Sequence, residues 1–309
     1  MDSLRTTVEA LVAGGGNLGR FRALRARVDE MGLGAQSRVE RIDWWTFQKN
    51  LLIEIPGPSD RIIYITAHYD RTDASPLKVV SLFLNGLPDE ALGWSYLSDG
   101  AIDNATGVAV ALELARHLAS SKPRDTYRVL LTGAEESGLR GSRAHVSRLS
   151  EDERGRLAFA VNIDTVGLAS NANCVTENVS NSDLLAAARA ASKSLGYPLE
   201  DDRLPFGAHG DFAPFRRTSF GRDVAYGLIF NMPGGLLPQR SWFTGPLSAP
   251  VINFSACGLV GPSDYLASAT LLPVGQLHGP RDRTSGVDRE RLFEQYAIIL
   301  KLLGSDPFI

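Results

Sequence analysis

The stretch RVLLTGAEESGLRGS, residues 128–142, decides the fold more than any other part of the chain. It opens with an apolar run typical of a buried strand and closes with a glycine-rich turn. Between them stand two adjacent acids, Glu135 and Glu136. Neighbouring carboxylates at the end of an apolar strand repel each other unless bulk water or a cation is present. The stretch therefore predicts either a metal site or a solvated acidic turn.

The two acids are suited to different tasks. Adjacent residues point in different directions, so one carboxylate can bind a metal while the other faces a substrate as an acid or base. We assign the first role to Glu136 and the second to Glu135.

Two further apolar runs end in residues that bind metals. The run RIIYITAHYD, residues 61–70, ends in His68 and Asp70, and the run LAFAVNID ends in Asp164. Ligands bind beyond the carboxyl ends of the strands in an open α/β sheet. Residues two apart on a strand share a face, so we expect the Asp70 carboxylate to accept the second ring N–H of His68. The alternative is a polar strand end that solvent satisfies.

The last two candidates lie outside strands. Asp103 precedes an amphipathic pattern over residues 108–118, where a carboxylate can either cap a helix or bind cations. His278 lies in a loop shortly before a final helical segment at about residues 288–303. Three strands that each end in a ligand-type residue, joined by these two side chains, predict one shared metal site.

These motifs resemble those of the two-zinc metallopeptidases of family M28, which include bacterial aminopeptidases and certain carboxypeptidases. The resemblance runs from about residue 51 to the C-terminus and rests on HYD (68–70), DNATG (103–107), EESGLRGS (135–142), NIDTVG (162–167) and HGPRD (278–282). It implies the zinc-dependent exopeptidase (phosphorylase/hydrolase-like) fold, a three-layer αβα arrangement around a mixed central β-sheet.

The resemblance also implies roles for individual residues. Asp103 would bridge two zinc ions, and the other ligands would divide between them: His68 and Asp164 on one, Glu136 and His278 on the other. Glu135 would be the general base. We also predict Asp70 to be a catalytic residue, through its bond to the His68 ring. Mixed carboxylate and imidazole ligands suit Zn²⁺, although Co²⁺ or Mn²⁺ fits the same set.

The chain departs from the family pattern in several places. Leu277 stands where many members carry a tyrosine, and Phe212 stands where members often have a histidine after Asp211. Two long segments, at about residues 71–100 and 220–250, are rich in turn-forming residues and lengthen the loops between elements. Substrate preference therefore does not transfer from other members.

Length and pattern predict one α/β domain over residues 1–309. Helical periodicity covers about residues 1–35, with a break at Gly14–Asn17. Strands are expected near residues 39–45 and 50–55, before the His68 strand. Strands that then alternate with helices indicate an α/β fold with helices on both faces of the sheet.

Composition argues against several classes of protein. The net charge is −3 with no basic cluster, which gives no support for nucleic acid binding, and no apolar stretch is long enough to span a membrane. The first residues lack the pattern of a secretory signal, so we expect a cytoplasmic protein. We accordingly expect free thiols at Cys174 and Cys257, and surface positions for His117 and His145.

The favoured function is hydrolysis of a peptide or amide bond next to a free terminus, as in an aminopeptidase, with a small peptide or amide as substrate. Three alternatives stay open: a single-zinc transamidase like the glutaminyl cyclases, a small-molecule amidohydrolase of a biosynthetic pathway, and a non-catalytic binding protein on the same fold. The sequence leaves the oligomeric state undetermined.

Overall fold

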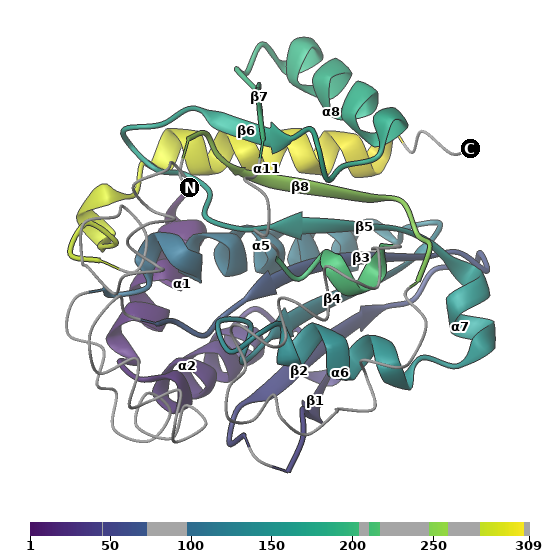
Figure 1. Ribbon diagram of the computed structural model, residues 1–309, viewed down its shortest axis with the longest axis horizontal. Coiled ribbons are helices and arrows are strands. Elements are labelled where there is room, and N and C mark those ends of the chain that lie inside the picture. The colour runs from purple at the N-terminus through teal and green to yellow at the C-terminus, as the bar shows by residue number, and fades with distance from the viewer. Residues whose placement is uncertain (45, 73–97, 204–209, 217–246, 259–278, 306–309) are drawn as a thin grey trace.

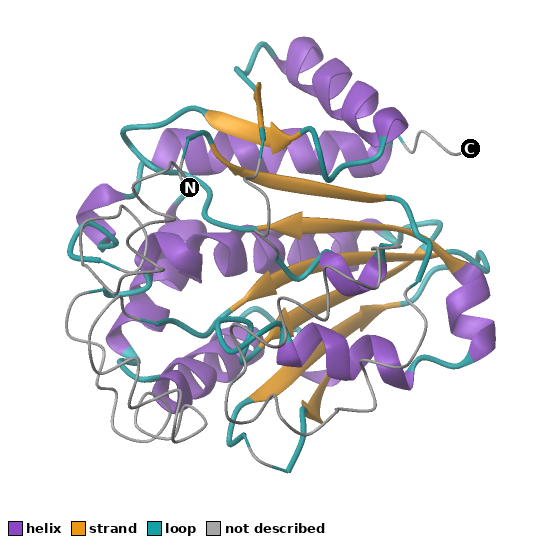
Figure 2. Cartoon of the chain, in the orientation of Figure 1, coloured by secondary structure: helices purple, strands orange, loops and turns teal. Residues whose placement is uncertain are grey.

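The protein has an eight-stranded mixed sheet covered by helices on both faces (Figure 1, Figure 2). The structure is a computed structural model, and it describes residues 1–44, 46–72, 98–203, 210–216, 247–258 and 279–305. The strand order is β1-β2-β4-β3-β5-β8-β6-β7. The strands are β1 (Ser37–Arg41), β2 (Lys49–Ile55), β3 (Ile62–His68), β4 (Thr126–Thr132), β5 (Leu157–Ile163), β6 (Asn173–Thr176), β7 (Glu200–Asp202) and β8 (Val251–Ala256). This confirms the predicted fold class.

Parallel strands form the centre of the sheet and antiparallel pairs form most of its margins. Strands β4, β3, β5 and β8 run parallel, whereas β2 pairs antiparallel with both β1 and β4, and β6 pairs antiparallel with β8. The carboxyl ends of β3, β4 and β5 therefore meet at one edge of the sheet. That edge places the three strand-end motifs of the sequence side by side.

Side-chain alternation along the strands divides the core into two layers. Ile63, Ile65 and Ala67 of β3 pack with the larger helical layer, whereas Ile62 and Tyr64 face the other side. The larger layer contains α1 (Asp2–Ala13), α2 (Asn17–Glu30), α5 (Thr106–Ser121), α8 (Ser182–Leu195) and α11 (Arg289–Gly304). The smaller layer contains α6 (Arg140–Arg148) and the short helix η3 (Ala213–Phe215), and α7 (Glu151–Arg156) precedes β5.

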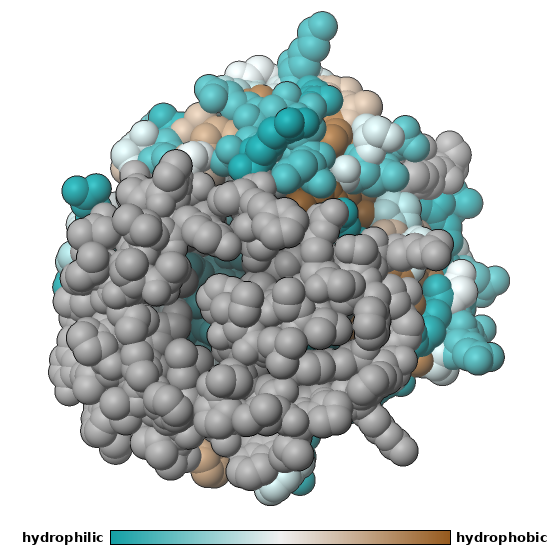
Figure 3. Space-filling model, viewed as in Figure 1, coloured by the Kyte–Doolittle hydropathy of each residue, from teal (hydrophilic) through white to brown (hydrophobic). Residues whose placement is uncertain are grey.

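The helices are amphipathic in the way their sequences predict. On α8, Leu184, Leu185 and Ala188 are buried, and the side chain of Asn181 caps the helix by accepting the amide N–H groups of Asp183 and Leu184. The described surface around β7 and α8 carries hydrophilic residues with hydrophobic ones among them (Figure 3). Among the helices in the described part of the chain, none has both the length and the apolar character needed to cross a membrane.

Two local predictions need correction. The strand expected at residues 39–45 runs instead from Ser37 to Arg41, because Asp43 accepts the amide N–H of Thr46 and turns the chain. Strands β6 and β7 are not among the predicted strands, because β6 has only four residues and β7 consists of three acidic ones.

His145 is also placed differently from the prediction. Only 3% of it is exposed, and its ring contacts the Glu40 carboxylate at 2.7 Å and the Tyr64 hydroxyl at 2.9 Å, because α6 turns this side chain toward the sheet. His117, by contrast, is exposed on α5 as predicted.

The prediction of free thiols is wrong. Cys174 and Cys257 form a disulfide, with Cα atoms 5.2 Å apart across a sequence separation of 83. The antiparallel pairing of β6 with β8 brings them together, because Asn173 lies opposite Ala256 in that register. Sequence spacing alone does not indicate this proximity.

Candidate metal centre

The candidate site lies at the sheet edge where β3, β4 and β5 end. His68 is the last residue of β3 and lies opposite Thr132, the last residue of β4. Asp164 follows the end of β5, and Glu135 and Glu136 follow β4 after a two-residue turn. The parallel register therefore brings residues separated by up to 96 positions to one place.

A first group of ligand atoms surrounds the His68 ring. His68 Nε2 lies 3.1 Å from Asp103 Oδ1 and 3.3 Å from Asp164 Oδ1. The three side chains offer one ligand atom each, all within 4.8 Å of one another. One nitrogen and two carboxylates at such separations can enclose a single divalent cation.

A second group shares the same histidine. His68, Glu135 and Glu136 also offer ligand atoms that lie within 4.8 Å of one another. The structure thus brings together His68, Asp103, Asp164, Glu135 and Glu136. His278, the fifth predicted ligand, lies outside the described residues, as do Leu277 and nearly all of the two long segments at 71–100 and 220–250.

Asp70 is part of the site but not through the hydrogen bond that we predicted. His68 Nδ1 bonds to the main-chain carbonyl of Asp70 at 3.1 Å, while the nearer carboxylate oxygen is 3.6 Å away. A carbonyl only accepts, so Nδ1 donates to it, and Nε2 is the ring nitrogen that faces the acids and is placed to bind a metal. The carboxylate of Asp70 instead accepts the amide N–H groups of Glu135 at 3.2 Å and Glu136 at 3.3 Å.

Asp103 is held by its own local structure and does not cap α5. Asp103 lies in the short helix η2 (Ala101–Ala105), and the peptide bond between Asp103 and Asn104 is cis. The N-cap residue of α5 is Ala105, and no side chain caps the helix there. Asn104 fastens the segment to β5 by donating to the Ile163 carbonyl at 2.9 Å. The capping interpretation of Asp103 is therefore wrong, and its carboxylate faces His68.

The charges of the site are unbalanced without a cation. Burial lowers the pKa of His68, but the charges of Asp164 and Glu135 raise it more, and the net pKa lies well above 6.5. Burial raises the pKa of Glu135 well above 4.5, His68 opposes the rise, and Glu136 adds to it. Burial likewise raises the pKa of Asp164. Four carboxylates around one imidazole constitute a donor set that a divalent metal ion would neutralise, so the residues fit such an ion.

Two buried acids next to the site have roles that the sequence analysis did not assign. Asp211 is 1% exposed and accepts the Thr132 hydroxyl, and its negative charge helps raise the pKa of Glu135. Asp282 is fully buried against the Asp103 segment. For both, the signal in the sequence is their position in family-like motifs, Gly210-Asp211-Phe212 for Asp211 and HGPRD (278–282) for Asp282.

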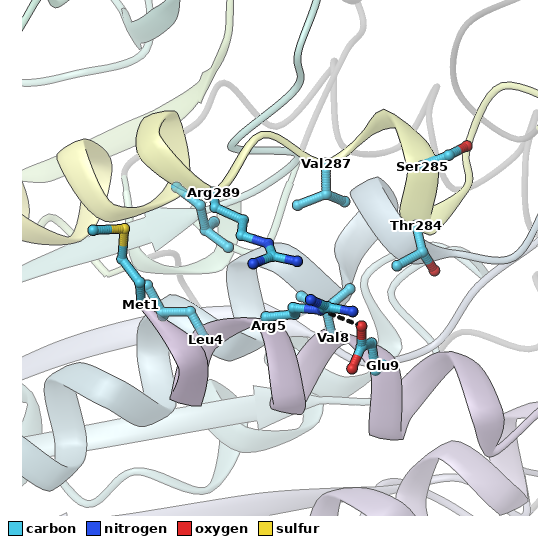
Figure 4. A pocket seen from close by; sticks show the side chains of 10 residues that line it. Met1, Leu4, Arg5, Val8, Glu9, Thr284, Ser285, Val287 and Arg289 are labelled. Carbon is cyan, nitrogen blue, oxygen red and sulfur yellow. Dashed lines mark hydrogen bonds and ion pairs between the residues drawn. The ribbon is translucent and has the colours of Figure 1, made fainter.

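A separate cavity of about 300 Å³ lies between α1 and the start of α11, lined by residues that include Arg5, Val8 and Arg289 (Figure 4). Arg5 is paired with Glu9 there. None of the four described candidate ligands, His68, Asp103, Glu136 and Asp164, lines this cavity.

Comparison with known proteins assigns the family. The model of Peptidase family M28 matches residues 50–221, which is more than half of the chain. The chain belongs to peptidase family M28. The match contains four of the five predicted ligands, and also Glu135, Asp70 and Asp211.

Individual relatives agree with this assignment. Aminopeptidase YwaD of Bacillus subtilis is 32% identical over 161 residues, which cover 51% of this chain and 30% of that protein. An aminopeptidase of Pseudomonas aeruginosa is 28% identical over 204 residues, or 62% of this chain and 35% of that one. The chain thus spans about a third of the length of these curated relatives.

Solved structures bear out the fold. A glutaminyl cyclase from an Acidobacteriales bacterium superposes with a TM-score of 0.67 at 14% identity, over 98% of this chain and 93% of that one. At these identities the likeness concerns the fold, which is that of the zinc exopeptidases of this family.

Proposed function

We propose that this protein is a zinc-dependent exopeptidase and, more narrowly, an aminopeptidase that removes a residue from the free amino end of a small peptide. Membership of the M28 family and the names of the relatives, aminopeptidase and zinc metalloprotease, support the proposal. The observation that carries it is the placement of Glu135. Asp70 binds the amide groups of both Glu135 and Glu136, so one acid can bind metal while its neighbour stays beside the same cluster.

The residues that would hold zinc are His68, Asp103, Glu136 and Asp164, together with His278 as predicted from the sequence. We propose that these residues would hold two ions per chain. When bound, zinc supplies Lewis-acid polarisation of water and of the scissile carbonyl.

The proton transfers belong to Glu135. Its buried carboxylate would accept a proton from the attacking water and then give that proton to the departing amine nitrogen. A pKa raised above the ordinary 4.5 suits this exchange, because burial makes the carboxyl take up a proton more readily. Asp70 would keep Glu135 in place through its amide group.

The test is Glu135→Gln, which keeps the shape of the side chain and removes the base. We expect kcat on leucine p-nitroanilide to fall by about 10³-fold or more while zinc content, measured by mass spectrometry, is unchanged. The control is Glu9→Gln, at an exposed ion pair with Arg5 on α1. Full activity in Glu135→Gln would refute the mechanism, and equal cleavage of the N-acetylated anilide would refute the aminopeptidase assignment.

A second candidate is a glutaminyl cyclase-like transamidase, because the cyclase structure matches nearly the full length of this chain and of itself. Release of ammonia from peptides that begin with glutamine, with one zinc per chain and no cleavage of leucine p-nitroanilide, would favour it. Preference for acylated small molecules would instead favour a biosynthetic amidohydrolase. A non-catalytic binding protein would turn over none of these substrates.

A further inference from the structure

The segment from Ser98 to Asp103 is fastened by one buried carboxylate that belongs to a distant part of the chain. Asp282 is fully buried, and its Oδ2 accepts the Ser98 hydroxyl at 2.5 Å. Its Oδ1 accepts the amide N–H groups of Ile102 at 2.6 Å and of Asp103 at 3.3 Å. Its main-chain carbonyl accepts the amide of Asp99 at 2.9 Å. Asp282 thus bonds to four of the six residues in this segment.

A buried cation binds the same segment through its carbonyl groups. Arg20 of α2 is fully buried, and its guanidinium donates to the carbonyls of Asp99 at 3.1 Å and Gly100 at 2.9 Å. It also donates to the carbonyl of Tyr69, the residue after His68, at 2.5 Å. The chain on either side of the site, after His68 and before Asp103, is therefore tied to one arginine.

The close approach leaves little freedom at the middle of the segment. Gly100 has φ +62°, and a Cβ there would lie 2.7 Å from Arg71 Cβ and 3.0 Å from Arg20 Nη1. A side chain at this position would push the segment away from Arg20.

Burying one carboxylate next to another destabilises the folded protein, because the two negative charges repel each other and both lose their hydration. Asp282 offsets this cost with donors on both of its oxygens, and Arg20 supplies a nearby positive charge. Because Asp282 binds the amide of Asp103 itself, it fixes the main chain from which the Asp103 side chain reaches His68 Nε2.

We propose that Asp282 is a positioning residue for metal binding. It holds the segment from Ser98 to Asp103 so that the Asp103 carboxylate faces His68, and Arg20 holds the same segment through the carbonyls of Asp99 and Gly100. This inference rests on the proposed function only in taking Asp103 as a metal ligand. It does not depend on the substrate or on the reaction.

The test is Asp282→Asn, which keeps the shape of the side chain, removes its charge and replaces one acceptor oxygen by an NH₂ group. We expect zinc affinity, measured by competition with a chromophoric chelator, to fall about 10- to 100-fold. In the metal-free protein we expect faster hydrogen–deuterium exchange in the peptides that cover residues 98–105, because asparagine offers one uncharged acceptor oxygen to the three donors that Asp282 binds with two carboxylate oxygens.

The matched control is Asp288→Asn. Asp288 also accepts two amide N–H groups, from Glu290 at 2.9 Å and Arg291 at 3.1 Å, but it caps α11, and its bonding partners include none of the described candidate ligands. The zinc affinity of the Asp288→Asn variant should stay within about twofold of that of the unaltered protein, because asparagine caps a helix as well as aspartate does. If Asp282→Asn does not fold, Ser98→Ala removes only the hydroxyl bond to Asp282 and should show the same changes on a smaller scale.

Unchanged zinc affinity and unchanged exchange at residues 98–105 in a folded variant would overturn the inference. Faster exchange with unchanged zinc affinity would also overturn it, since Asp282 would then be a loop anchor alone. Loss of zinc affinity in a protein that cleaves no peptide would refute the proposed function and leave the positioning role of Asp282 standing.

Discussion

At the residue level, Asp70 links the two halves of the candidate site. Its carbonyl orients the His68 ring, and its carboxylate binds the amide groups that carry Glu135 and Glu136. One residue thereby sets the proton position on the imidazole and the location of both acids.

Asp70→Asn should weaken zinc binding and lower kcat about 10- to 100-fold each, because the amide side chain can accept only one of the two N–H groups. Asp202→Asn is the matched control, since Asp202 also accepts two amide groups, from Arg203 and Gly258, away from the site. Chelator competition and steady-state kinetics measure both effects. Equal loss in the control would mean that general destabilisation is the cause.

Glu153 should make folding stability depend on acid pH. Burial raises the pKa of Glu153, but the Ser150 amide and Arg128 lower it more, to about 2 from 4.5. Because the folded pKa is depressed, the stabilisation is fully present above about pH 4.5 and is lost as the pH falls through about 2.

Glu153→Gln should therefore cost about 1–2 kcal/mol at pH 7, after allowance for a side chain that is 26% exposed, and almost nothing near pH 2. Urea unfolding at several pH values measures this difference. A cost that stays constant across the acid range would contradict the assignment. Glu151→Gln, at an exposed residue of the same helix turn, serves as the control.

At the level of elements, the start of α5 is fixed by close packing against β5. A Cβ at Gly107 would collide with the Asn104 side chain and with the Ile163 carbonyl, which are themselves hydrogen-bonded at 2.9 Å. The Asn104 side chain also accepts the amides of Gly107 and Thr165. Helix, strand and the turn that carries Asp103 thus depend on one glycine.

Gly107→Ala should destabilise the protein by about 2–3 kcal/mol, because it overpacks the site and disturbs these bonds. Gly155→Ala in α7 is the opposite case, since a Cβ there meets nothing within 4 Å, and it should stabilise by up to about 1 kcal/mol through higher helix propensity. Thermal and urea unfolding of both variants give the comparison. The same sign for both would show that propensity, not packing, governs Gly107.

At the level of the whole molecule, the disulfide joins β6 to the end of β8 and closes a long stretch of chain. Disulfides persist chiefly in oxidising compartments, so this bond weighs against the cytoplasmic location expected from the sequence. Cell fractionation with a probe for free thiols would decide the location.

Replacing Cys174 and Cys257 together by alanine should lower the free energy of unfolding by about 2–4 kcal/mol, because the cross-link restricts the unfolded chain. Zinc content should not change, since neither cysteine is a candidate ligand. Urea midpoints of the double variant, and of the unaltered protein with and without reductant, test this. No difference between the oxidised protein and the double variant would contradict it.

Much of the fold and site follows from local sequence. Apolar runs of strand length predict β3, β4 and β5, and a ligand-type residue at the end of each predicts a shared edge, because parallel strands place their carboxyl ends together. The assignments of His68, Asp103, Asp164 and Glu136 as ligands and of Glu135 as base stay predictions, now with side chains within reach of one another.

The sequence by itself determined which residues lie at the strand ends, because periodicity and strand-end chemistry are properties of neighbouring residues. Only the tertiary structure decided which of them bond. The partners of Asp282 lie about 180 positions away, and the two cysteines meet through the β6–β8 register. The carboxylate of Asp70 binds amide groups in the turn after the neighbouring strand, and its main-chain carbonyl binds the His68 ring. Such pairings depend on how strands and helices pack, and a hydrogen bond over a few ångströms is fixed only once that packing is complete.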